Sequence, residues 1–88
     1  MKRNAEKTGI YDEDNVRALI KRTYKELTGK PSKELSISYR DFSYKIVLGV
    51  KEVLITKKIP DVYYKNYSNK PQRDWAIKKI KDKIQFLL

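Results

Sequence analysis

The densest run of apolar residues lies between Ser38 and Ile59, and we expect the rest of the chain to pack around it. At a helical period, its apolar residues fall on one broad side and its polar residues on a narrow stripe. The apolar side holds Phe42, Ile46, Val47, Val50, Val53 and Leu54, and is widened by Leu48 and Ile55. Because a helix of this pattern is nearly buried, the sequence predicts a central helix over residues 38–59.

The same stretch also fits β-strands, because apolar and polar residues alternate over parts of it. The alternating apolar positions are Leu35, Ile37 and Tyr39, then Phe42, Tyr44 and Ile46. Strands require turns, and residues 33–59 contain no Asn, no Pro and no Asp-Gly pair. Arg40-Asp41 and Lys51-Glu52 are poor two-residue turns because neither pair readily adopts positive φ. We therefore favour the helix over strands.

The residues on either side of this stretch predict further helices. Residues 12–28 place apolar side chains at helical spacing, with Asp12 or Asp14 as the cap and Gly29 as the left-handed terminator. Pro60 at a first helical position predicts a short helix, followed by a turn at residues 68–70. A last helix begins at Pro71 and runs to the C-terminus, capped by residue 69 or 70.

These elements predict an all-α fold, a small bundle of three to four helices around the central one. We expect residues 12–88 to form a single helical domain preceded by a flexible arm over residues 1–11. The alternative is an α+β fold, in which a short antiparallel sheet over residues 34–59 is flanked by N- and C-terminal helices. A homodimer is compatible with a chain this short.

Composition excludes several classes of function. The 88 residues include no cysteine and no histidine, so we expect no disulfide and no metal site. No catalytic motif is present, and we expect neither an enzyme nor a cofactor. No apolar run is long enough to span a membrane and the N-terminus does not resemble a signal peptide, which leads us to expect a soluble, cytoplasmic protein without a membrane partner.

The net charge of +10 favours a polyanionic partner, for which we expect nucleic acid, and DNA in particular. Arg17, Lys21 and Lys25 recur every fourth residue, about 6 Å apart along a helix, and this row could follow a phosphate backbone. The remaining predicted nucleic-acid contacts are Lys57, Lys58, Lys78 and Lys79, with Tyr63 and Tyr64 as candidates to stack on unpaired bases. The expected function is that of a small accessory or regulatory protein that binds this backbone.

A protein partner is the alternative. Trp75 and Phe86 lie opposite the predicted inner face of the last helix, among lysines. Exposed aromatic residues of this kind often anchor interfaces. They would suit a non-enzymatic inhibitor or adaptor, of the sort that mobile elements encode, which docks on an acidic protein surface.

Overall fold

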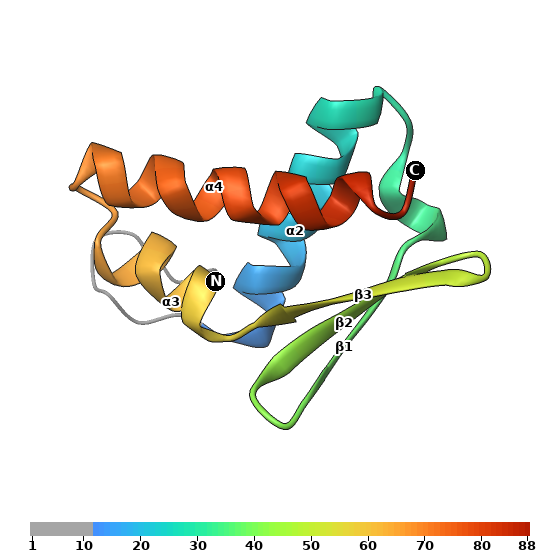
Figure 1. Ribbon diagram of the computed structural model, residues 1–88, viewed down its shortest axis with the longest axis horizontal. Coiled ribbons are helices and arrows are strands. Elements are labelled where there is room, and N and C mark those ends of the chain that lie inside the picture. The colour runs from blue at the N-terminus through green and yellow to red at the C-terminus, as the bar shows by residue number, and fades with distance from the viewer. Residues whose placement is uncertain (1–11) are drawn as a thin grey trace.

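The computed structural model describes residues 12–88, so the arm predicted over residues 1–11 lies outside the described residues. The described chain is an α+β fold (Figure 1). Its elements are, in order, α2 (Glu13–Thr28), the short 3₁₀ helix η1 (Ser32–Glu34), β1 (Ser36–Arg40), β2 (Ser43–Leu48), β3 (Lys51–Thr56), α3 (Lys58–Lys65) and α4 (Lys70–Gln85). The prediction of an all-α bundle is therefore wrong, and the α+β alternative is confirmed.

The predicted central helix is an antiparallel sheet of three strands in the order β1-β2-β3. Tyr39 pairs with Tyr44, which in turn pairs with Ile55, so these three side chains stand on the same face of the sheet. That face is covered by the helices, which all lie on one side of the strands in Figure 1. The opposite face, which we call the outer face, carries mostly polar side chains.

Two tight turns make the sheet possible, and neither is at a pair of residues weighed from the sequence. Asp41 and Phe42 connect β1 to β2 with φ angles of 52° and 60°, the signature of a type I′ turn. Gly49 has a φ of 64° at the start of the next turn, which fits type II′. Sequence reasoning missed the first turn because Phe is rarely found with positive φ.

The core lies between the sheet and the helices and draws its buried residues mainly from α2, β2, β3, α3 and α4, while Ile37 and Tyr39 of β1 pack against it half-buried. Its buried residues are Val16, Leu19, Ile20, Tyr24, Leu35, Tyr44, Ile46, Ile55, Ile59, Tyr63, Tyr64, Ala76, Ile80, Ile84 and Leu87. Ile46 is buried as predicted, whereas Phe42, Val50 and Leu54 are exposed, contrary to the predicted apolar side of a helix. Leu54 is exposed because neighbouring residues of a strand point to opposite faces, and Phe42 and Val50 are exposed because they lie in the two turns between strands.

The predictions for the flanking helices are confirmed. Asp12 caps α2 by accepting the backbone N–H of Asn15 at 3.0 Å, and Asn15 caps back to the N–H of Asp12 over 3.0 Å. Gly29 ends the helix in the left-handed conformation, with a φ of 70°. Asn69 caps α4 through the N–H of Gln72 at 3.2 Å. Two helices differ from the expected bounds, since α3 begins two residues before Pro60 and α4 begins at Lys70 and ends at Gln85, before the C-terminus.

Candidate nucleic-acid interface

Half of the net positive charge lies on the hairpin formed by α3 and α4. Residues 58–85, which form the α3–α4 hairpin, contain eight basic and three acidic residues, a net charge of +5. On the sheet, by contrast, Arg40 pairs with Asp41 at 3.6 Å, and Lys45 pairs with Glu52 at 3.2 Å. The hairpin therefore carries a larger excess of positive charge than the sheet does.

The α3–α4 hairpin carries a hollow of about 480 Å³ on its surface, which we call the Trp75 hollow. It is lined by Lys58 and Val62 from α3 and by Pro71, Gln72 and Trp75 from α4. Trp75 is 39% exposed, and the ammonium nitrogen of Lys79 lies 5.9 Å from the centre of its ring. The hollow therefore combines an accessible aromatic ring with the ammonium group of Lys58, the ammonium group of Lys79 lies near the same ring, and none of the lining residues described is acidic.

The turn between the two helices fixes their relative position. Arg73 donates a hydrogen bond to the backbone carbonyl of Tyr67 at 3.0 Å. Its guanidinium also lies over the aromatic ring of Tyr67, 4.9 Å from the ring centre. The Tyr67 ring also packs edge-on against Tyr63, with ring centres 5.5 Å apart. These contacts tie the start of α4 to the end of α3, so the walls of the Trp75 hollow belong to one packed unit.

Asp61 and Asp74 directly precede two lining residues of the hollow, Val62 and Trp75. Each of these acids pairs with a lysine that does not line the hollow. Asp61 pairs with Lys57 at 3.2 Å, and burial raises the pKa of its carboxyl while Lys65 opposes the shift. Asp74 accepts a hydrogen bond from Lys70 at 2.7 Å, which lowers its pKa. Within residues 12–88, neither Lys58 nor Lys79 has a carboxylate partner, so both charges remain available to an anion.

The structure thus brings together three of the predicted site residues, Lys58, Trp75 and Lys79, from two elements. Lys78 is exposed on the same helix. The ammonium group of Lys57 forms an ion pair with Asp61, so less of its charge is available to a ligand. Phe86 is 71% exposed and lies further along α4, near its end.

The row predicted on α2 is only partly available. Arg17 donates from its Nε to the backbone carbonyl of Ile37 at 3.2 Å and pairs with Glu13 and Asp14, each at 3.3 Å. These contacts satisfy its guanidinium and join α2 to β1, so we assign it a structural role. Lys21 and Lys25 are exposed.

Two predicted stacking residues are part of the core. Tyr63 and Tyr64 are only 5% and 4% exposed, and their rings meet edge-on with centres 4.9 Å apart. The Tyr64 hydroxyl donates to the carbonyl of Asn15, while that of Tyr63 lies 3.4 Å from Arg22. Neither ring presents a face to a base, so the stacking role proposed for them does not fit the structure.

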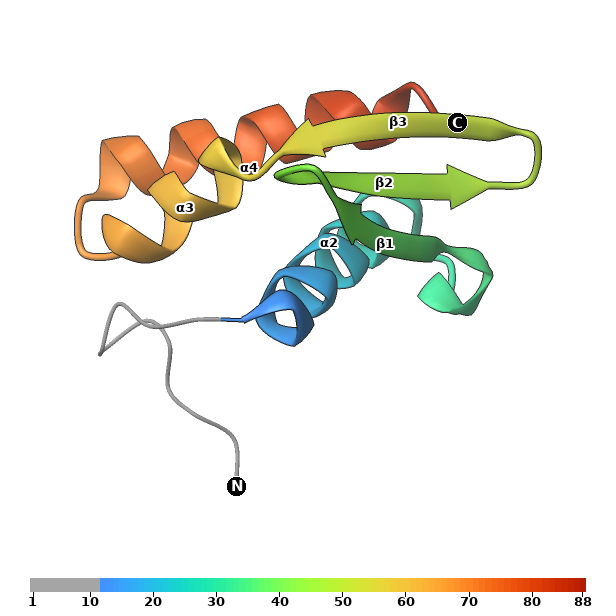
Figure 2. The same cartoon turned by 90° about the horizontal axis from the view of Figure 1, so that it is seen from below.

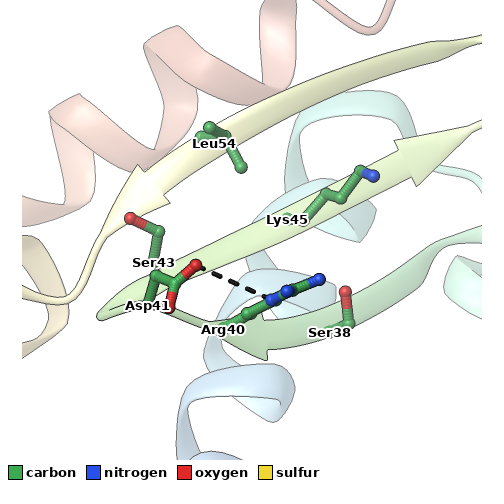
Figure 3. Close-up of a pocket in the computed structure, with 6 residues that line it drawn as sticks. All are labelled: Ser38, Arg40, Asp41, Ser43, Lys45 and Leu54. Carbon is green, nitrogen blue, oxygen red and sulfur yellow. Dashed lines mark ion pairs between the residues drawn. The ribbon is translucent and has the colours of Figure 1, made fainter.

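The outer face of the sheet holds a second hollow, which sequence reasoning missed (Figure 3). Its volume is about 340 Å³, and it is lined by Ser38, Arg40, Asp41, Ser43, Lys45 and Leu54. The charges of Arg40 and Asp41 offset one another across the dashed contact in Figure 3. This face therefore has little attraction for a polyanion, in contrast to the Trp75 hollow. The alternation of residues 36–40 was the only sequence signal for it.

Comparison with known proteins adds no relative, because no protein-family model, curated protein or solved structure matches the chain. Over residues 12–88, no cluster of acidic side chains is suited to holding a metal ion. In the same range, every helix is too short or too polar to cross a bilayer. The interpretation of this site therefore depends on its own geometry and charge.

Proposed function

We propose that this chain is a non-enzymatic nucleic-acid-binding protein that contacts the phosphate backbone through the α3–α4 hairpin. The observation that carries the proposal is that Lys58 and the exposed ring of Trp75 line one hollow whose described lining residues include no acid, with the ammonium nitrogen of Lys79 5.9 Å from the centre of that ring. Lysine ammonium groups bind phosphate as compact point charges, and the release of counterions from the nucleic acid drives such binding.

The surroundings of the hollow support the same function. Lys78 and Lys81 continue the positive charge along α4, on the hairpin whose net charge is +5. A basic surface of this kind attracts nucleic acid at long range and speeds encounter. Phosphate contacts position a protein on nucleic acid without reading its sequence, so we expect weak discrimination among base sequences.

The test is a titration of the full chain with labelled DNA and RNA, each as single strand and duplex. Because counterion release drives binding, affinity should fall steeply between about 50 and 200 mM salt. Lys58→Gln and Lys79→Gln should each weaken binding and reduce the slope of log affinity against log salt by about one.

Lys51→Gln is the matched control. It removes the same charge beside the β2–β3 turn, at the end of the sheet away from α3 (Figure 2). Equal losses from all three substitutions would mean that overall charge, and not this hairpin, sets the affinity. An absence of binding to every nucleic acid at low salt would overturn the proposal.

A second candidate function is docking on an acidic protein surface, and Phe86 favours it. This side chain is 71% exposed, and a spacing of eleven residues places it on nearly the same side of α4 as Trp75. Two aromatic anchors among lysines would suit an acidic protein groove. Binding to a protein partner should depend on both rings and less on salt, whereas phosphate binding should depend mainly on the lysines.

A further inference from the structure

The turn between β1 and β2 has an unusual composition for its geometry. Both of its residues have positive φ, 52° at Asp41 and 60° at Phe42. Type I′ turns favour Asn or Asp followed by Gly, because a side chain at positive φ crowds its own backbone. Asp is tolerated in this conformation, but a bulky residue such as Phe is an outlier. Phe42 therefore occupies a position at which glycine would fit without strain.

Burial of the side chain does not offset this strain. Phe42 is 75% exposed, so its ring contributes little to the core. Its backbone carbonyl accepts the N–H of Lys57 at 2.8 Å. Any residue could accept that hydrogen bond. Because strained residues concentrate where a protein binds or reacts, the exposed ring points to a ligand contact.

The position of the turn connects it to the Trp75 hollow. The hydrogen bond from Lys57 holds the backbone of Phe42 beside the start of α3, and the next residue, Lys58, lines the hollow. In Figure 2 the β1–β2 turn and α3 lie at the same end of the sheet. Phe42 and Trp75 are thus two exposed aromatic residues linked through the start of α3, Phe42 by its hydrogen bond to Lys57 and Trp75 by the hollow that it shares with Lys58.

We propose that Phe42 is a second stacking contact for an unpaired nucleic-acid strand, which would rest one base on Trp75 and another base of the same strand on Phe42. This inference depends on the proposed function and narrows it to single-stranded substrates. Lys58, which lines the Trp75 hollow and follows the residue bonded to Phe42, would contact a phosphate of that strand. Every base has a π-face, so such a site tolerates sequence, whereas the bases of a duplex are stacked on one another and cannot use it.

The experiment compares Phe42→Gly, Phe42→Leu and Phe42→Tyr with the natural chain. Phe42→Gly creates the turn sequence that type I′ geometry prefers, so its melting temperature should be unchanged or higher. Its affinity for a single strand should nevertheless fall at least about fivefold, the lower end of the loss expected for one stacked base. Phe42→Leu keeps the strain without the aromatic ring and should lose a similar amount, whereas Phe42→Tyr should retain binding. Duplex affinity should not change.

Trp75 provides a direct readout, because it is the only tryptophan in the chain. Stacking of a base on its ring should quench its fluorescence, in the natural chain and in Phe42→Gly alike, with a weaker midpoint in the variant. Val50→Ala, at the exposed position of the other turn, is the control and should change neither affinity nor quenching.

The outcomes separate this inference from the proposed function. If the natural chain binds nucleic acid but Phe42→Gly binds a single strand equally well, the inference is wrong and the proposed function stands. If the three Phe42 variants lose duplex and single-strand binding together, the ring is not a base contact. If the natural chain binds no nucleic acid, both fail, and Phe42 becomes a candidate anchor for a protein partner.

Discussion

The hydroxyl of Tyr64 donates a hydrogen bond to the backbone carbonyl of Asn15 at 2.9 Å, across 49 residues of sequence. It joins α3 to the first turn of α2. Because Tyr64 is 4% exposed, this bond is formed where water has little access. Tyr64, which was predicted to stack on bases, instead connects α3 to α2.

Tyr64→Phe should therefore destabilise the fold while leaving the ring packing in place. Removal of a single hydrogen bond of this kind typically costs about 0.5–1.5 kcal/mol. Chemical denaturation should show a lower midpoint with an unchanged slope. An unchanged midpoint would mean that the bond contributes no net stability, since the ring itself is retained.

Two substitutions distinguish the observed sheet from the predicted helix. Ile46 is fully buried on β2, so Ile46→Ala should lower the free energy of unfolding by about 2–5 kcal/mol. Val50 lies in the exposed β2–β3 turn, and Val50→Ala should change it by no more than about 0.5 kcal/mol. Equal losses at both positions, measured by denaturation, would favour the helical arrangement.

Tyr44 should make stability depend on alkaline pH. Burial, with a smaller contribution from the charge of Glu13, raises the pKa of its hydroxyl to about 12, from 10.0 when unperturbed. The folded state therefore favours the neutral phenol. The stability that the neutral phenol contributes is fully present below pH 10 and is lost as the pH rises toward 12. The full loss is roughly 2–3 kcal/mol at about 1.4 kcal/mol per pH unit.

The Tyr44→Phe variant has no hydroxyl to ionise at this position. Its stability should therefore fall less than that of the natural chain between pH 10 and pH 12. Thermal denaturation of both proteins at pH 8 to 12 makes the comparison, in which the lysines titrate equally. Parallel curves would show that Tyr44 ionises as readily in the folded state as in the unfolded chain.

Trp75→Ala should separate the two kinds of partner. If unpaired bases stack on the ring, single-strand affinity should drop about fivefold or more while duplex affinity changes little. If an acidic protein is the partner, removal of this anchor could cost about 2 kcal/mol or more of binding energy. Filter binding with both nucleic-acid forms at fixed salt gives the comparison, and equal losses for the two forms would argue against stacking.

Helix ends were the most predictable part of this fold. Asp12, Gly29 and Asn69 act through local chemistry, because a cap or a terminator needs only the few residues beside it. Gly29 was assigned to its role from the sequence, and Asp12 and Asn69 were each one of two candidate caps that the structure now selects. Local signals of this kind do not depend on the rest of the chain.

The sheet and the site depend on information that the sequence does not display. The apolar residues of 38–59 fit both a helical and a strand period, and the turn that decides between them contains a residue atypical of turns, Phe42. Lys58 and Trp75 are 17 residues apart, and only the packing of α3 against α4 brings them to one hollow. The burial of Tyr63 and Tyr64 likewise follows from tertiary packing.

The two-residue turns of the sheet also bear on how the chain folds. Each strand pairs with its immediate neighbour in sequence, so the loops that must close are short and cost little entropy. The contact between Tyr64 and Asn15 instead closes a loop of 49 residues around the whole sheet. The strands can therefore pair early in folding, because their partners are close in sequence. α2 can complete the core only after α3, which follows the sheet, has packed against it.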